Sequence, residues 1–259
     1  MNKRPCLFFL GALLLFTGCI KFDHVLTLRP DGSGAMEFKY TIPENSLSQF
    51  KTMMKLKDNL TIDKDETFVP FEETDLHRIF LNSSEEQAKK ELRTYEEYGI
   101  TAETVKIQSV HGQRQAHFVI MFDNLAKIAR TEIFGEYGFN VTRDKNGDFV
   151  LSRPPERILA GRAQSSSSVL SEKDLKGLSP FLSGFHAGIR IVTPSRIITS
   201  SAQRKASDNV AVWNFDFDTN PNALTALENQ KFEVVFDGTD RGIKIPQVRM
   251  RTGLPAESK

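Results

Sequence analysis

The residue types that most often carry catalysis occur in this chain at spacings that fit no common catalytic motif. The five histidines, His24, His77, His111, His117 and His186, include no pair at His-x3-His spacing, as a zinc protease would need. A serine hydrolase would need a Gly-x-Ser-x-Gly turn, which the sequence lacks. His24 and His117 lie in apolar strand patterns, which predicts partly buried core residues, and His111 lies in a predicted turn.

Oxygen ligands for a metal are the next chemistry to consider. Asp144-x-Asn146-Gly147-Asp148 has the oxygen spacing of a calcium loop, but an EF-hand places its glycine sixth and a glutamate twelfth. Gly147 is instead where an Asn-Gly hairpin turn needs a positive φ angle, which favours a turn. The adjacent glutamates, such as Glu85 and Glu86, are typical of solvated surfaces, and no phosphate-binding glycine loop occurs. We therefore predict no catalytic residue, no metal ligand and no cofactor.

The two cysteines are the most informative residues, and both lie near the N-terminus at Cys6 and Cys19. Lys3 and Arg4 precede an apolar run from Leu7 to Phe16, an arrangement typical of a secretory signal peptide. That run is too short for a transmembrane helix, which needs about 20 apolar residues.

The run ends in Phe16-Thr17-Gly18-Cys19, which resembles the lipobox of bacterial lipoproteins, although leucine is usual where Phe16 stands. The resemblance implies that residues 1–18 are a removed signal peptide and that Cys19 becomes the lipidated N-terminus. The alternatives are that Cys19 is an ordinary small residue near a conventional cleavage site, or that 5–20 is a short anchor. Lipidation is favoured because the mature chain would then carry a single cysteine whose thiol is consumed by lipid.

A lipidated Cys19 implies a location outside the cytoplasm, in the cell envelope. Each buried acyl methylene contributes about 0.8 kcal/mol, so two or three chains of the palmitate kind anchor a protein stably. In a Gram-negative cell, Ile20 after the cysteine would permit sorting to the outer membrane, with the domain in the periplasm. The expected partner is therefore membrane lipid, held through acylated Cys19.

Composition narrows the class of partner further. The chain has 34 basic and 33 acidic side chains and a net charge of +1, without the basic excess that nucleic-acid binding needs. We therefore expect no nucleic-acid partner. Twenty phenylalanines can build a large apolar core without disulfides.

Hydrophobic alternation predicts three hairpins and later strands. The hairpins span 20–42, 105–122 and 139–151, and the strands span 186–193, 196–201, 209–217 and 230–236. In the first hairpin, Met36, Phe38 and Tyr40 share one face and should point into the core. Trp213, Phe215 and Phe217 should likewise point inward, with Trp213 as a core anchor; the alternative is that Trp213 borders a lipid groove.

Helices are predicted at 43–57, 124–133 and 221–228. A further helix is opened by a capping box at Ser83–Glu86, continues through Ala88, Leu92 and Tyr95, and is ended by Gly99. Hairpins mixed with helices predict an α+β fold, with an antiparallel sheet and several packed helices. The expected organisation is a signal peptide at 1–18, an α+β region at 19–159 and a Ser-rich linker or loop at 160–172. A β-rich region at 173–238 completes the same domain, and a basic flexible tail follows at 239–259.

Several patches resemble the LppM domain of bacterial lipoproteins. They are Ile189–Pro194, Ile197–Ser201, Val210–Phe215 and Ala223–Ala226, together with Cys19 and the turn Asp31–Gly34. The match covers about a third of the chain, and unlike many such proteins this sequence shows no apolar helix after the domain. The resemblance implies an envelope lipoprotein with a β-rich domain and no assigned enzymatic chemistry.

The leading functional hypothesis is a membrane-tethered, non-enzymatic envelope lipoprotein that acts as a binding or structural module. Its domain would bind a lipid, another envelope protein or its own copies. The alternative is a lipoprotein hydrolase whose site is assembled from scattered Asp, Glu, His and Ser residues.

Overall fold

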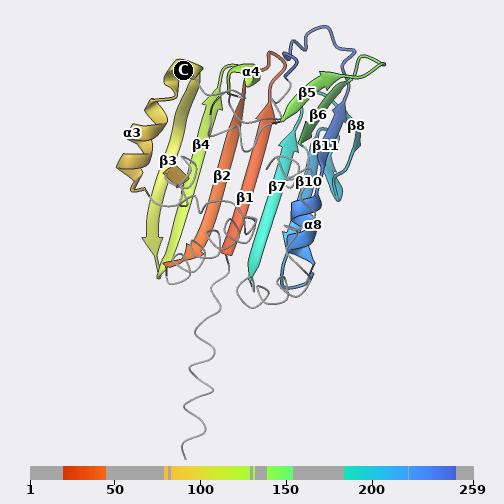
Figure 1. The fold of residues 1–259 in the computed structure, drawn as a ribbon. Helices are drawn as coiled ribbons and strands as arrows, with labels where there is room; N and C mark the ends of the chain where they lie inside the picture. Colours follow the sequence, from red (N-terminus) through yellow and green to blue (C-terminus); the bar gives the residue numbers. More distant parts are fainter. Residues whose placement is uncertain are drawn as a thin grey trace, which may run out of the picture.

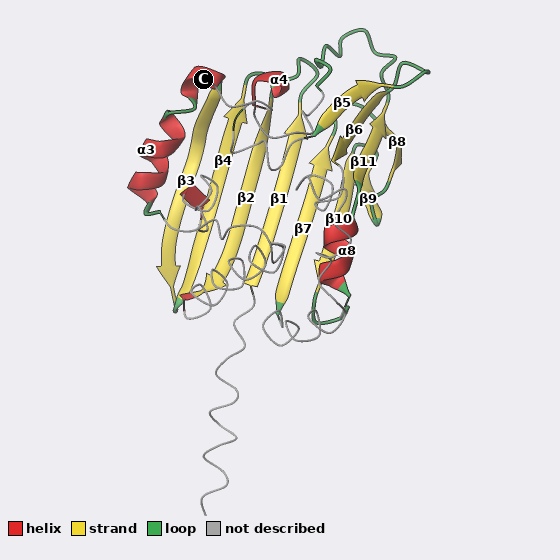
Figure 2. Cartoon of the chain, viewed as in Figure 1, coloured by secondary structure: helices red, strands yellow, loops and turns green. Residues whose placement is uncertain are grey.

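The computed structural model describes residues 20–44, 79–80, 83–128, 131, 139–153, 184–220 and 222–248. Most of these residues are in strands, which form two sheets (Figures 1 and 2). The larger sheet has seven strands, in spatial order β3 (Ile100–Val110), β4 (Gln113–Phe122), β2 (Gly34–Pro43), β1 (Ile20–Leu28), β7 (Phe185–Val192), β10 (Val210–Asp216) and β9 (Arg204–Ser207). The smaller sheet has four, in the order β5 (Asn140–Arg143), β6 (Phe149–Arg153), β11 (Phe232–Phe236) and β8 (Ile197–Ser200).

The described helices are short, and they correct the predicted fold class. They are α3 (Glu85–Arg93), the 3-10 helix η3 (Glu96–Tyr98), α4 (Leu125–Ile128) and α8 (Ala223–Asn229). The expected α+β fold with several packed helices is therefore wrong, because the described part of the chain is mainly β (Figure 2). None of its helices combines the length and the hydropathy needed to span a bilayer.

Particular elements show where the helix predictions succeeded and failed. The helix start predicted at Ser83–Glu86 is confirmed, but the cap is Ser84. Its hydroxyl accepts a hydrogen bond from the Gln87 amide at 3.2 Å, whereas the Ser83 hydroxyl donates to the Ile79 carbonyl. Pro43, expected to open a helix, is the last residue of β2 and pairs with Gln113. Of the helix expected at 124–133, the described residues show α4, while 129–130 and 132–133 lie outside them. Most of the helix expected at 43–57 also lies outside the described residues.

The first hairpin is confirmed, and it forms the centre of the larger sheet. β1 pairs with β2 in antiparallel register, and Met36, Phe38 and Tyr40 are all buried, as the alternation predicts. Gly34 begins β2 where the backbone leaves no space, because a Cβ there would lie 2.1 Å from the Thr27 carbonyl oxygen. The tight return of the chain therefore depends on a glycine at this position.

One strand pairing departs from the expected antiparallel arrangement. β1 pairs with β7 in parallel, with Val25 beside Arg190. The two strands are far apart in the sequence, so no turn signal connects them. This parallel pair joins the N-terminal hairpins to the C-terminal strands, and β6 and β11 join the same two regions in the smaller sheet.

Alternation along each strand gives the larger sheet two different faces. The inner face carries the apolar side chains, among them Phe38, Phe118, Ile191 and Trp213, and packs at β10 against the smaller sheet. Trp213 is fully buried there, edge-on to Phe232 of β11 with ring centroids 5.3 Å apart. The predicted core position of Trp213 is confirmed.

The expected loose tail from residue 239 is packed as far as Val248. Ile243, Ile245 and Val248 are buried, and Val248 forms a β-bridge with Val141 of β5. The Lys244 amide also donates to the Pro30 carbonyl at 2.6 Å. These contacts hold the segment against the rest of the fold. The apolar residues that make the contacts alternate with the basic residues that suggested a tail.

Candidate functional site: the outer face of the larger sheet

The face of the larger sheet opposite the core is the broadest exposed surface that the described residues form. We call it the outer face; its members on the five central strands include Lys21, Asp23, Val25, Thr27, Ala35, Glu37, Lys39, His117, Val119, Met121, His186, Gly188, Arg190, Val192, Val210, Val212, Asn214 and Asp216. Of these, only Val212 is buried. A seven-stranded sheet with one face open in this way has room for a partner of protein size.

Register divides the outer face into a polar half and an apolar half. The half nearer the start of β1, which we call the anchor end, carries two polar rows that include Lys21 with His186 and Lys39 with Asp23. The half farther from the anchor end is mainly apolar, with Glu37 and Arg190 on either side of Val25; its apolar members include Val25, Val119, Met121, Val192 and Val210. These side chains are only half-buried, so the apolar half can still bury area on binding.

Glu37 organises charge in the middle of the outer face. Its carboxylate lies 2.5 Å from the Lys39 ammonium and 2.8 Å from the His117 Nε2. Burial raises the pKa of Glu37, but the hydrogen bonds and positive charges of Lys39 and His117 outweigh burial and lower the pKa. His117 was expected in the core, but it lies on the outer face. The reason is that it is adjacent to the inward-pointing Phe118 in β4, so its side chain points the opposite way.

Arg190 and Asp23 are two further charges on this face. Both are exposed, and no ion pair joins either to another described residue. The Asp23 carboxylate leans over Gly188, where a Cβ would lie 2.5 Å from the Asp23 Oδ1. Both side chains therefore present their charge at the surface of the outer face.

Three possible metal ligands meet at the anchor end, which the sequence analysis missed. One ligand atom from each of His186, Asp216 and Asp218 lies within 4.8 Å of the others. Both aspartates already accept backbone hydrogen bonds, Asp216 from the amides of Asp218 and Thr219, and Asp218 from Gly184 at 2.6 Å. These hydrogen bonds hold the start of β7 against the loop after β10, and they explain why the three side chains lie close together.

The same hydrogen bonds affect the pKa of Asp216. Burial raises it, but the amide hydrogen bonds and the neighbouring His186 outweigh burial, so the pKa is lowered overall. Only strand register brings His186 and Asp216 together, since they are cross-strand partners separated by a long stretch of sequence. No local spacing signal could have revealed the cluster.

Polar groups on the inner face serve packing. The Tyr40 hydroxyl donates to the Phe80 carbonyl and accepts from the Arg114 Nε at 3.1 Å, while the Arg114 guanidinium also donates to the Ser83 carbonyl at 2.6 Å. Burial raises the pKa of Tyr40 more than Arg114 lowers it. These contacts fasten Phe80 and Ser83 to β2 and β4.

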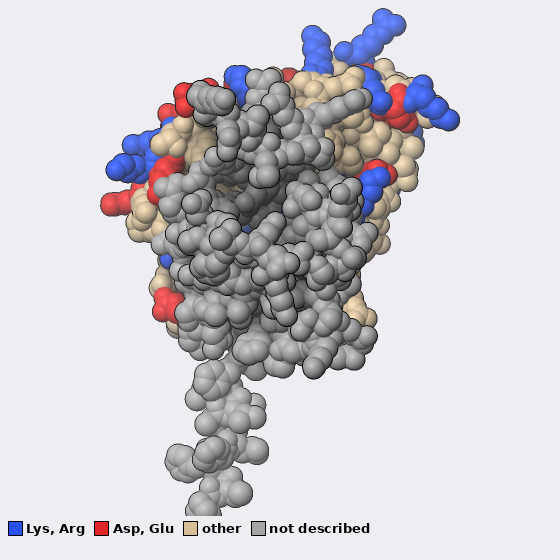
Figure 3. Space-filling view, in the orientation of Figure 1, with Lys and Arg blue, Asp and Glu red and all other residues tan. Residues whose placement is uncertain are grey.

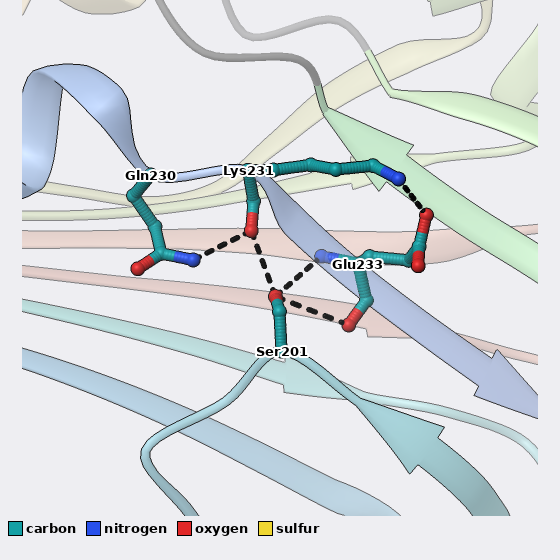
Figure 4. Close-up of polar contacts among 4 residues, drawn as sticks. All are labelled: Ser201, Gln230, Lys231 and Glu233. Atoms are coloured by element: carbon teal, nitrogen blue, oxygen red, sulfur yellow. Dashed lines mark hydrogen bonds and ion pairs between the residues drawn. The ribbon is translucent and has the colours of Figure 1, made fainter.

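Ser201 bears on the hydrolase alternative, because it is a serine surrounded by polar groups (Figure 4). Its hydroxyl donates to the Lys231 carbonyl at 2.7 Å and accepts from the Glu233 amide at 3.0 Å. Its carbonyl accepts the Trp213 Nε1 hydrogen at 3.1 Å. Ser201 therefore ties β8, β10 and β11 together, and these bonds do not prepare its hydroxyl as a nucleophile.

The Asp144 loop is a hairpin turn between β5 and β6, as predicted. Gly147 has φ 87°, and the Asp144 Oδ1 accepts the amide hydrogens of Asn146 at 2.8 Å and Asp148 at 3.0 Å. The Asp148 Oδ1 accepts from the Gly238 amide at 3.1 Å. The carboxylates therefore satisfy backbone donors of the turn.

We expect Asp144→Ala to lower the free energy of unfolding by about 1 kcal/mol, because two turn amides lose their acceptor. Asp144→Asn keeps an acceptor oxygen and should stay close to the parent in urea unfolding. Adding Ca²⁺ should leave the thermal midpoint of the parent unchanged. A calcium-dependent rise in that midpoint, lost in Asp144→Asn, would instead identify a calcium loop.

Charged side chains elsewhere are mixed in sign. The space-filling view shows Lys and Arg beside Asp and Glu over α3 and over the turn between β5 and β6 (Figure 3). Such mixing produces no extended field of one sign on these parts of the surface. The one predicted site residue, Cys19, lies outside the described residues, directly before Ile20 of β1.

Comparisons with known proteins yield a likeness to solved structures. No protein-family model matches the chain, and no curated protein matches it. Among solved structures, the chain is similar to the NMR structure of the folded domain of LppM from Mycobacterium tuberculosis. The identity is 10%, the match covers 94% of this chain and 99% of that one, and the TM-score is 0.39. This is the family that the sequence patches resemble, but a likeness of this size carries no argument about function.

Proposed function

We propose that the protein is a lipid-anchored binding module of the bacterial cell envelope, tethered through Cys19 and acting through the outer face of its larger sheet. The observation that carries this proposal is the start of β1. Ile20, the residue after Cys19, is already in the strand and is only 6% exposed. A lipid on Cys19 would therefore be joined to the central strand of the sheet with no linker between them.

This attachment would determine how the domain meets the membrane. With the anchor end against the head groups, β1 would run away from the bilayer and the neighbouring strands would stand beside it (Figure 1). The outer face would then stand upright, with its polar half nearest the membrane. Side chains of this face would be free to bind a partner in the envelope.

The arrangement of polar groups supports binding over catalysis. The described polar clusters at Tyr40, Ser201 and Asp216 hold backbone groups in place. The outer face, in contrast, presents half-exposed apolar side chains beside Asp23 and Arg190. Exposed apolar area bordered by charge is typical of a protein interaction surface.

We expect Cys19→Ser to move the chain from the membrane fraction to the soluble fraction, or to leave it with its signal peptide uncleaved. The reason is that two or three acyl chains supply the membrane affinity, at about 0.8 kcal/mol for each methylene. Fractionation followed by immunoblotting measures the change. Cys6→Ser is the matched control, because Cys6 lies in the segment to be removed, and it should behave as the parent. Equal membrane retention of the processed parent and Cys19→Ser chains would contradict the proposal.

A further inference from the structure

We propose that two copies of the chain pair face to face through the outer face, related by a two-fold axis that runs along β1. This inference rests on the proposed function and names the partner of the same surface. Sheets packed in this way lie about 10 Å apart with their strands within about 30° of each other. The argument depends on which residues the axis would bring together.

Strand order makes the larger sheet suitable for such an axis. β1 is the fourth of the seven strands. A two-fold axis that runs parallel to β1, midway between the two sheets, therefore places β2 of one copy over β7 of the other, β4 over β10 and β3 over β9. Every strand of one sheet then has a counterpart in the other. An axis along any other strand would leave strands at the edge without a counterpart.

Apolar residues would meet apolar residues in the half farther from the anchor end. Val25 lies on the axis and would face Val25 of the second copy. One strand out and one row further along, Val192 would face Ala35 of the second copy. Two strands out in that row, Val210 would face Met121 of the second copy.

The charges complement each other under the same rotation. In the Val25 row, Arg190 and Glu37 flank Val25 on opposite sides, so Arg190 would face Glu37 of the second copy. In the next row towards the anchor end, Lys39 would face Gly188 of the second copy. Since the Asp23 carboxylate leans over Gly188, that lysine would meet a carboxylate there.

The geometry also places Asp23 favourably although its strand lies on the axis. Its carboxylate lies away from the axis, over β7 at Gly188. Rotation moves the second Asp23 carboxylate to the opposite side. The two like charges are therefore separated, and each lies beside a lysine of the other copy.

Tethering favours this pairing over other face-to-face arrangements. An axis parallel to β1 leaves both chains running in the same direction, so both copies of Ile20 lie at the same end. Two copies anchored in one membrane can therefore form the pair without releasing either lipid. Confinement to one surface also raises their effective concentration.

The size of the face matches a stable interface. Strands about 4.8 Å apart, overlapping over four to nine residues that rise about 3.3 Å each, give a flat area of about 740 Å² for each copy. Specific protein interfaces bury about 800 Å² on each partner. The outer face is thus large enough to hold a dimer together.

Cross-linking in native membranes tests the inference. Val25→Cys places one thiol on the axis, whereas Ile198→Cys places one on β8 of the smaller sheet, at a side chain that is 45% exposed. A short bismaleimide should link Val25→Cys into a dimer at least about tenfold more efficiently, because only that thiol meets its copy at high effective concentration. The parent chain should give no dimer.

A charge reversal tests the predicted contacts. Adding Arg190→Glu to Val25→Cys should lower the dimer yield by about tenfold, because attraction to Glu37 becomes repulsion. Adding Glu37→Arg as well should restore the yield. Equal yields from Val25→Cys and Ile198→Cys, or no restoration by the double reversal, would overturn the inference.

Fractionation of the same samples separates the two proposals. A chain that is not in the membrane fraction contradicts lipid anchoring, and the Val25 and Ile198 yields are then compared in the soluble fraction. A chain in the membrane without preferential cross-linking at Val25 contradicts the dimer alone. Binding of a lipid or of an unrelated protein to the outer face would give this second result.

Discussion

Trp213→Ala is expected to lower the free energy of unfolding by about 4 kcal/mol, a large fraction of the stability of a typical domain. The indole is fully buried and lies edge-on to Phe232, so its removal leaves a cavity between the two sheets. The substitution also removes the hydrogen bond from Nε1 to the Ser201 carbonyl, which then remains without this donor. Urea unfolding followed by circular dichroism measures the loss.

Ile198→Ala is the matched control for this substitution. Ile198 is also apolar and near the junction of the sheets, but its side chain is 45% exposed. We expect its stability to change by less than about 0.5 kcal/mol, because little apolar surface is exposed by the truncation. Similar losses from the two substitutions would show that Trp213 does not anchor the core.

The second large effect is a loss of stability on acidification that depends on His24. Burial is the main reason that the pKa of His24 is lowered to about 4, and the positive charge of Arg153 adds to this. In the unfolded chain the pKa returns to about 6.5, so the unfolded state takes up the proton first as the pH falls. The contribution of neutral His24 is therefore complete above pH 6.5 and is lost progressively towards pH 4.

The size of the effect follows from the difference between the two pKa values. Between pH 7 and pH 4 the parent should lose on the order of 3 kcal/mol more than His24→Gln, which has no proton to gain. Urea unfolding at a series of pH values gives both curves. His111→Asn, in the exposed turn between β3 and β4, controls for removing a histidine. Parallel curves for the parent and His24→Gln would contradict the burial of a neutral His24.

Local patterns in the sequence predicted the hairpins and the orientation of their side chains. Met36, Phe38 and Tyr40 share a parity, and burying one of them requires burying all three. The helix cap at Ser84 and the turn at Gly147 were also readable, because the interactions that form them join residues close in sequence. These elements needed no knowledge of the tertiary fold.

What the sequence could not predict depends on contacts between distant segments. The parallel pairing of β1 with β7 has no turn between the strands to signal it. The His186–Asp216 pair exists only in the register between β7 and β10, and the outer face exists only once both pairings are formed. The four-residue strand β9 was missed, since its residues are all exposed and show no hydrophobic alternation.

The mass of the protein extracted from membranes tests lipid anchoring at Cys19 most directly. Intact mass spectrometry, with sequencing of the N-terminal peptide, should show a mature chain that begins at Cys19 and carries the added mass of a diacylglyceryl group. The attachment should map to Cys19, one residue before β1 begins. A chain that begins at another residue, or that begins at Cys19 without an acyl group, would contradict the account.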